Sequence, residues 1–330
     1  MHHELASLHY RDIRVALAAV PRAQMLIGLA LTALAYTALV SYDWLAVRYV
    51  QHPLPLRRVA FVSFIAYALS QSLGFPMLLG GSLRYRFYSA WGLSSADIAL
   101  AVGFNAVTFW MGVLTIGGLV FLVEPQATPQ LLGLPVASLA TIGVLLLVLV
   151  AAYLIASVLR RAPLRALGWE FSLPTPALAC AQVLVSSIDW AMAGAVLYAV
   201  LPAQEHPVPF VAFLSAFLLA QVVGLLSHVP GGLGIFESVI VILLKDEVPA
   251  AGLVGALLAY RVIYYLVPLT GALLLLATHE VSRARHGISR AAKLAGRWAP
   301  GVVPSVLAIT TFTAGTILLL SGATPGVRSR

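Results

Sequence analysis

Apolar runs long enough to cross a lipid bilayer recur along almost the whole chain. A spanning helix needs about 20 predominantly apolar residues, and a helix satisfies its own backbone polar groups where no water is available. The sequence therefore predicts an all-α, polytopic helical membrane protein with about eight spanning helices. In chain order, these are expected at residues 23–42, 59–83, 98–123, 134–159, 176–201, 207–228, 248–278 and 302–321.

Composition and motifs agree with this class and exclude several others. Of the 330 residues, 61% are hydrophobic and 10% are charged, whereas a soluble domain carries roughly 25% charged residues. The net charge of +8 comes from Lys and Arg between apolar runs, which indicates membrane topology rather than nucleic-acid binding. The single cysteine, Cys180, excludes an intrachain disulfide. With no phosphate-binding loop, zincin motif or nucleophile elbow, we expect no catalytic residue, metal or cofactor.

The distribution of basic residues predicts an orientation. Lys and Arg cluster near the N-terminus, around residue 160 and after residue 280, and basic loops face the cytoplasm. Arg48, Arg57 and Arg58 contradict this scheme, because it places them outside. The expected divisions are a cytoplasmic N-terminal tail (1–22), a transmembrane domain with two related halves (23–278), a basic cytoplasmic loop (279–300), and a last helix with the C-terminal tail (301–330).

Two segments interrupted by glycine and proline suggest an internal repeat. Residues 70–110 and 220–265 each end one helix, break it, and enter another helix through a polar residue followed by aromatics. Paired broken segments of this kind point to a transporter binding site, although small residues also recur by chance. The two halves could run parallel or inverted. The predicted break residues are Gly80, Gly81, Pro230, Gly231, Gly232 and Gly234.

Ionisable residues inside the apolar runs are candidates for a site, since charge is costly at membrane depth. Glu237 could bind a cation or an ammonium group, or it could simply pair with Arg261. Arg261 suits a phosphate, and Asp189 lies well inside its apolar run. The candidate residues for substrate binding and translocation are Glu237, Arg261, Asp189, Arg84, Arg86, Asn105, Tyr264 and Tyr265.

Several of these residues also have a structural interpretation. Arg84 and Arg86 could anchor a helix end at the cytoplasmic surface. Asn105, like Gln71, could form hydrogen bonds between helices. Asp43, which precedes a tryptophan, is interpreted as the interfacial end of the first helix.

The most distinctive motifs resemble a known family. HVPGGLGIFESVIVILL, followed by ALLAYRVIYYLVPL, resembles the transmembrane part of the bacterial lysylphosphatidylglycerol synthase/flippase family, the multiple peptide resistance factor group, and LGFPMLLGGSLRYRFY resembles its first-half motif. The resemblance implies a multi-pass protein of the bacterial inner membrane, with Glu237, Arg261 and the two Gly-Gly pairs in the pathway. It implies movement of aminoacylated phosphatidylglycerol to the outer leaflet, a process linked to antimicrobial peptide resistance.

The long members of that family also carry a soluble domain that transfers the aminoacyl group from charged tRNA, and the residues up to Arg330 contain no counterpart of it. The resemblance therefore favours a lipid flippase without transferase activity. Two alternatives stay open: the membrane part of an aminoacyl-phosphatidylglycerol synthase whose acyltransferase lies elsewhere, and a small-solute transporter. The expected partner is the phospholipid, with an acyltransferase and a second copy of the chain left open and no nucleic acid bound.

Overall fold

The computed structural model describes residues 20–73, 79–124, 136–160, 164–166, 169–203, 207–227 and 229–284. Helices dominate these residues, and the only strands among them form one short antiparallel hairpin. The elements are α3 (Arg22–Tyr49), α4 (Leu56–Leu73), α5 (Gly81–Ala90), α6 (Ser95–Val123), α8 (Val136–Leu159), β1 (Leu164–Ala166), β2 (Trp169–Phe171), α9 (Pro176–Ala199), α10 (Phe210–Leu226), the 3-10 turn η2 (Pro230–Gly232), α11 (Ile235–Leu244), α12 (Ala250–Tyr260), the π-helical turn η3 (Arg261–Leu266) and α13 (Val267–Ala284).

Within the described part of the chain, five helices are long and apolar enough to cross a membrane. They are α3, α6, the stretch Leu139–Leu159 of α8, α9, and the continuous helix Ala250–Ser282 that joins α12, η3 and α13. Two further apolar helices, α10 and α11, are shorter. The all-α membrane fold is thus confirmed, although the expected count of eight spans is not reached among these residues. The span predicted at 302–321 lies outside them, as do residues 1–19 and 285–300.

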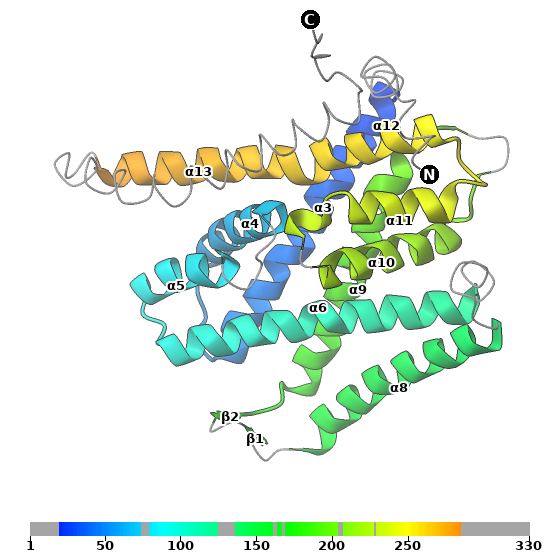
Figure 1. The fold of residues 1–330 in the computed structure, drawn as a ribbon. Coiled ribbons are helices and arrows are strands. Elements are labelled where there is room, and N and C mark those ends of the chain that lie inside the picture. Colours follow the sequence, from blue (N-terminus) through cyan, green and yellow to red (C-terminus); the bar gives the residue numbers. More distant parts are fainter. Residues whose placement is uncertain are drawn as a thin grey trace, which may run out of the picture.

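Small residues allow the central helices to approach closely. In Figure 1, α3 and α9 run steeply past the other helices, and α6 crosses α9 and packs against α8. A Cβ at Gly112 of α6 would lie 2.7 Å from the carbonyl oxygen of Ser186 in α9, and one at Gly118 would lie 3.1 Å from the carbonyl oxygen of Gly143 in α8. Membrane helices have no hydrophobic force between them and associate through such close backbone packing.

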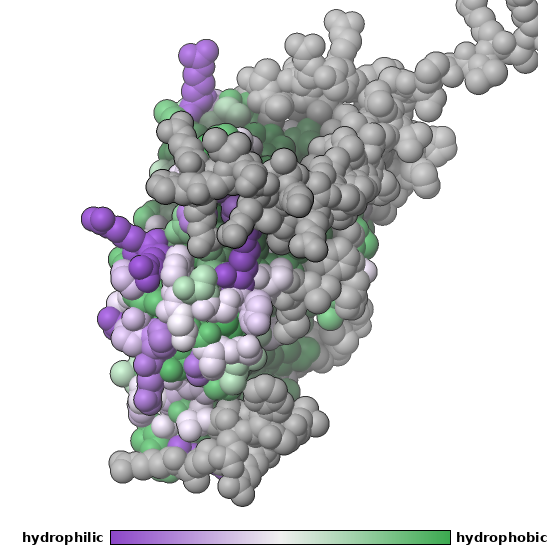
Figure 2. Space-filling model, turned by 90° about the vertical axis from the view of Figure 1, so that its left-hand side faces the viewer, coloured by the Kyte–Doolittle hydropathy of each residue, from purple (hydrophilic) through white to green (hydrophobic). Residues whose placement is uncertain are grey.

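One end of the bundle gathers five chain segments, and we call it the basic end. The Tyr49 hydroxyl at the end of α3 donates to the carbonyl of Ser172, which precedes α9. Arg58 at the start of α4 lies 5.2 Å from the ring of Trp91, which follows α5. The ring of His279, near the end of α13, packs against the aromatic side chains of α4 and α5. Figure 2 looks onto this end and shows hydrophilic side chains gathered there.

The opposite end contains the start of α3 and the end of α9. A Cβ at Gly28 in α3 would lie 3.5 Å from Val200, which follows α9. The Tyr198 hydroxyl donates to the carbonyl of Val208, just before α10. The first described helix therefore starts at the end opposite to that where α13 finishes (Figure 1). The sequence-based scheme had put the chain before residue 23 and the loop after residue 278 on one side of the membrane.

Two short helical hairpins point toward each other across the bundle. The α4–α5 pair belongs to the basic end, and the α10–α11 pair belongs to the opposite end (Figure 1). The tip of the second hairpin reaches the end of α4, since a Cβ at Gly231 would lie 3.5 Å from the carbonyl oxygens of Gln71 and Ser72. The internal repeat stays a prediction, but both predicted broken segments end near the centre of the fold.

Three glycines of the second break lie in a left-handed backbone conformation. Gly231, Gly232 and Gly234 have φ angles of +61°, +62° and +82°, a left-handed region that disfavours side chains with a Cβ. The first break differs within the described residues. Gly80 has a φ of −64°, and Gly81 is the first residue of α5. The second pair of glycines turns the chain, whereas the first pair adopts or begins a helix.

Candidate functional site

Glu237 and Arg261 form one ion pair at the tip of the α10–α11 hairpin. The guanidinium Nε donates to Oε1 of Glu237 at 2.6 Å, and Nη1 donates to the carbonyl oxygen of Gly231 at 2.8 Å. The backbone N–H of Gly234 donates to the other carboxylate oxygen at 2.7 Å. Glu237 therefore caps the N-terminus of α11, where the helix dipole also favours negative charge. The left-handed turn therefore contributes two backbone groups to this ion pair, the carbonyl of Gly231 and the N–H of Gly234.

This ion pair keeps part of its surface accessible. The side chains of Arg261 and Glu237 are 13% and 25% exposed. Tyr265 covers one side of the guanidinium, with its ring centre 4.6 Å from Cζ. The two side chains of a partly exposed ion pair can separate, and each can then bind the oppositely charged group of a ligand.

Arg261 also begins the π-helical turn η3, which is a rare conformation often found at functional sites. The sequence supplies a reason for irregular backbone here. Pro268 has no N–H, so the carbonyl of Tyr264, four residues earlier, lacks its usual α-helical donor. The Tyr36 hydroxyl approaches that carbonyl oxygen at 3.5 Å. The turn is thus tied to α3, and Arg261 is held at the point where the helix departs from α geometry.

A second ion pair joins α3 to α5. Arg84 donates from Nε to Oδ1 of Asp43 at 2.6 Å and from Nη2 to Oδ2 at 2.7 Å, and Asn105 of α6 donates to Oδ1 at 2.9 Å. The carboxylate is fully buried, and the guanidinium is 5% exposed. The interpretation of Asp43 as an interfacial helix end was wrong, because α3 continues to Tyr49 and buries the acid. This second pair is closed to ligands and holds three helices together.

The other predicted residues of the first half have local structural roles. A Cβ at Gly80 would lie 2.9 Å from Nη1 of Arg84, so glycine leaves room for the guanidinium. Gly81 has nothing within 4 Å of an added Cβ. Arg86 forms an ion pair with Glu280 of α13 at the basic end. Arg84 and Arg86 are therefore separated by the fold, although only one residue lies between them in the sequence.

Asp189 is buried in the middle of α9. The Tyr42 hydroxyl donates to its Oδ2 at 2.9 Å. The other oxygen, Oδ1, is buried and has no hydrogen-bond partner among the described residues. Within the same part of the chain, no Lys, Arg or His forms an ion pair with this carboxyl group. Asp189 therefore differs from Asp43, whose charge is fully matched.

Aromatic side chains connect the two ion pairs through Asp189. The Tyr67 ring lies 4.7 Å from Cζ of Arg84 and 6.1 Å from the ring of Tyr42, which donates to Asp189. On the other side, Tyr36 and Tyr264 interact electrostatically with Asp189. Their rings are 6.0 Å apart, and the rings of Tyr264 and Tyr265 are 5.4 Å apart. We call this set the tyrosine path. Its members are Arg84, Tyr67, Tyr42, Asp189, Tyr36, Tyr264, Tyr265 and Arg261.

The structure thus divides the predicted site residues among four places, one of which is the position of Asp189 in the middle of α9. Glu237, Arg261, Tyr264 and Tyr265 lie together, Arg84 and Asn105 share Asp43, and Arg86 lies at the basic end. Sequence reasoning missed the roles of Asp43 and of three tyrosines in the path. A signal was available for the acid, since the apolar residues 44–47 continue the first helix beyond it. The missed tyrosines are Tyr36, Tyr42 and Tyr67.

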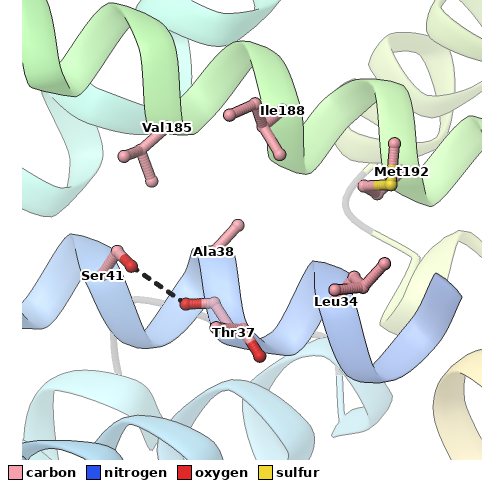
Figure 3. Close-up of a pocket in the computed structure, with 7 residues that line it drawn as sticks. All are labelled: Leu34, Thr37, Ala38, Ser41, Val185, Ile188 and Met192. Carbon is pink, nitrogen blue, oxygen red and sulfur yellow. Dashed lines mark hydrogen bonds between the residues drawn. The ribbon is translucent and has the colours of Figure 1, made fainter. Parts of the chain in front are cut away.

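A groove of about 270 Å³ runs between α3 and α9 on the outside of the bundle. Figure 3 shows Ala38 of α3 and Val185 and Ile188 of α9 pointing into the space between the two helices. The Ser41 hydroxyl donates to the carbonyl of Thr37, and the Thr37 hydroxyl donates to the carbonyl of Ala33. These internal bonds leave a largely apolar surface suited to hydrocarbon. The lining residues are Leu34, Thr37, Ala38, Ser41, Val185, Ile188 and Met192.

Comparison with known proteins gives matches over most of the chain. The family model for the lysylphosphatidylglycerol synthase TM region matches residues 5–272. The chain is 37% identical to the Synechocystis protein slr0712 over 282 residues, which cover 86% of this chain and 87% of that protein. It is 32% identical to the Escherichia coli inner membrane protein YbhN over 255 residues, or 77% of this chain and 79% of YbhN.

Longer proteins match through one part of their length. The chain is 28% identical to the phosphatidylglycerol lysyltransferase of Staphylococcus haemolyticus over 288 residues. This alignment covers 86% of the chain but 33% of the lysyltransferase. The same enzyme from Staphylococcus aureus is 25% identical, with 32% of its length covered. The chain therefore spans about a third of these lysyltransferases, and most of the two shorter relatives.

Proposed function

Because this chain belongs to the lysylphosphatidylglycerol synthase TM region family, we propose that it moves phospholipids between the leaflets of the bacterial inner membrane. The expected substrate has a headgroup that combines a phosphate with an ammonium group, as aminoacylated phosphatidylglycerol does. The multi-pass architecture and the relationship to an E. coli inner membrane protein support the location. The relationship to phosphatidylglycerol lysyltransferases supports the class of lipid.

The accessible ion pair between Glu237 and Arg261 carries this proposal. The pair is largely buried although part of its surface is accessible, and removing one partner from such a pair leaves an uncompensated charge, which is unfavourable. A headgroup with both signs of charge avoids that cost, since its phosphate can bind Arg261 while its ammonium binds Glu237. A guanidinium also suits the geometry of phosphate oxygens. The pair can therefore open for such a lipid and close again without leaving either charge alone.

The external groove supplies a place for the apolar part of the same substrate. It lies between α3 and α9, and its lining is apolar once the hydroxyls have bonded within α3. Ile188 in the groove precedes Asp189 in the bundle interior. An acyl chain in the groove would remain in a hydrocarbon environment while the headgroup passes through the protein.

We propose further that the basic end faces the cytoplasm. Arg48, Arg57, Arg58 and Arg86 belong to the chain segments at this end, and basic loops face the cytoplasm. This orientation accounts for the three arginines that the sequence-based scheme placed outside, and it reverses that scheme for the start of α3. It also places the start of α3 at the periplasmic end.

Cysteine labelling tests the orientation. With Cys180 replaced by alanine, Pro53→Cys introduces a thiol at the basic end, and Glu247→Cys introduces one in the exposed loop between α11 and α12. A membrane-impermeant maleimide added to intact cells whose outer membrane is permeable should label only the second. Labelling of the first alone would reverse the proposed orientation.

Lipid movement can be measured directly in reconstituted vesicles. Labelled lysylphosphatidylglycerol is placed in one leaflet, and its amine is then detected in the other with an impermeant amine reagent. The native chain should equilibrate the label, and Glu237→Gln and Arg261→Gln should slow it. Glu247→Gln makes the same chemical change at an exposed loop and should behave as the native chain. An unchanged leaflet distribution with correctly folded native protein would contradict the proposal.

The partial coverage of the lysyltransferases favours one second candidate. In that case, the chain is the membrane part of an aminoacyl-phosphatidylglycerol synthase and works with an acyltransferase. Co-expression with such an enzyme would then raise the amount of aminoacylated lipid without any leaflet exchange by the purified chain. Saturable uptake of a water-soluble amine, with no lipid movement, would instead indicate a small-solute transporter.

A further inference from the structure

Asp189 is a buried acid whose negative charge is not compensated by either ion pair. It lies 13 residues after the start of α9 and 10 before its end, or about 20 Å and 15 Å at 1.5 Å per residue. Its surroundings contain apolar side chains and phenols, and its Oδ1 has no hydrogen-bond partner among the described residues. An ionised carboxylate with a single hydrogen bond is unfavourable at this depth. The site needs one positive charge to become neutral.

The neighbouring titratable groups cannot supply that charge. Among the described residues, the groups found to interact electrostatically with Asp189 are tyrosines, which are neutral near physiological pH. The helices α6, α8, α10 and α12 also pack on α9. Each of them contains at most one titratable residue, and that residue is an acid or a phenol. The tyrosines are Tyr36 and Tyr42 of α3, Tyr67 of α4 and Tyr264 of η3. The others are Asp97 in α6, Tyr153 in α8 and Tyr260 in α12, with none in α10.

Asp43 provides an internal comparison. Both acids are buried in long apolar helices, but Asp43 accepts two hydrogen bonds from Arg84 and one from Asn105. Asp189 accepts one, from Tyr42, and keeps an oxygen unused. The same residue type is thus paired with a cationic side chain in one place and with no cationic side chain of the described residues in the other. Asp189 lies on the tyrosine path, between the closed pair and the accessible pair.

We propose that Asp189 is a cation-exchange site. It holds a proton on its carboxyl group when the path is empty, and it releases that proton to water when an ammonium group takes its place. The carboxyl oxygen–hydrogen bond breaks, the carboxylate pairs with the incoming cation, and the site remains neutral throughout. The ammonium step rests on the proposed function, whereas proton binding does not.

Exchange of this kind has a measurable consequence for transport. One proton leaves the site for each ammonium-bearing headgroup that enters, so a proton gradient can drive the lipid in the opposite direction. For one-to-one exchange, a gradient of one pH unit should bias the distribution of the lipid between leaflets by about tenfold, since one pH unit and a tenfold concentration ratio represent equal free energies.

Infrared spectroscopy of the purified chain tests proton binding without any transport. The native protein should show the carbonyl stretch of a protonated carboxyl group at neutral pH, and Asp189→Asn should remove that band. Asp246→Asn, at an exposed position, makes the same change outside the bundle and should leave the band in place. Addition of lysylphosphatidylglycerol should reduce the band in the native protein. Identical neutral-pH spectra for the native chain and a folded Asp189→Asn variant would overturn the proposal.

Vesicles with an imposed pH gradient test the exchange. The native chain should accumulate the lipid in one leaflet, and Asp189→Asn should abolish this bias, whereas Asp189→Glu should retain it in part. A bias of equal size in the native chain and in Asp189→Asn would overturn the exchange. If the native chain moves no lipid at all, the proposed function fails, and the infrared comparison still decides whether Asp189 binds a proton.

Discussion

The geometry of the turn at Gly231 predicts how much stability the protein loses when this glycine is replaced by alanine. Gly231 has a φ of +61°, and its backbone lies against the end of α4. A Cβ there would meet the carbonyl oxygens of Gln71 and Ser72 at 3.5 Å, which is an ordinary contact distance. Gly231→Ala should therefore cause backbone strain with little steric overlap. The left-handed region costs a non-glycine residue about 1–2 kcal/mol.

Gly103 provides the matched control. It lies within α6, and a Cβ added there meets nothing within 4 Å. Alanine is favoured over glycine inside a helix by about 0.5–1 kcal/mol, so Gly103→Ala should stabilise the fold slightly. The same chemical change should thus have opposite signs at the two positions. The expected difference in free energy of unfolding is about 1.5–3 kcal/mol, the sum of the two effects.

Reversible unfolding in mixed detergent micelles measures this difference. Each variant is titrated with a denaturing detergent, and its free energy of unfolding is compared with that of the native chain. The reasoning would be refuted if Gly231→Ala were as stable as Gly103→Ala, because the positive φ would then impose no cost. Translocation assays on the same two variants would show whether the turn also positions Arg261.

Other variants test the packing and the closed ion pair. Arg84→Leu should lower the free energy of unfolding by about 3–5 kcal/mol, because it leaves the Asp43 carboxylate buried without its cation; a double variant that also carries Asp43→Leu should recover much of this loss in the same titration. Gly112→Ala should destabilise the fold by about 1–3 kcal/mol, since the new Cβ would lie 2.5 Å from Trp190, and a thermal melt with no shift would contradict it. Tyr42→Phe removes the single donor to Asp189 and should lower the free energy of unfolding by about 0.5–1.5 kcal/mol, because the proposed proton keeps the acid neutral; a loss of about 3 kcal/mol in the same titration would indicate an ionised acid.

The two ion pairs show how the same chemistry is used for different purposes. The pair of Asp43 and Arg84 is bidentate and buried, with Asn105 as a third partner. The pair of Glu237 and Arg261 also uses backbone groups from a glycine turn, and it remains partly exposed. Exchange of partners requires access, so the second pair is the better candidate for contact with a headgroup. The first is better understood as a fixed connection between helices.

The sequence by itself determined the features that depend on local chemistry. Long apolar runs can satisfy their backbone in a membrane only as helices, so most helix positions follow from the pattern of residues. Glycine and proline at the second break predicted an interrupted helix, because both residues are unfavourable inside a continuous one. The pairing of Glu237 with Arg261 was one of two stated alternatives, since two costly charges occur 24 residues apart in adjoining apolar segments.

Only the tertiary structure decided which distant groups meet. The partner of Arg84 is Asp43, 41 residues earlier, and the partner of Asp189 is Tyr42, 147 residues earlier. Each depends on how one helix is rotated against another, which close contacts at small residues set. The ends at which the chain segments gather depend on the same packing. An isolated charge in a sequence shows that compensation is required, but the fold alone determines whether a neighbour supplies it.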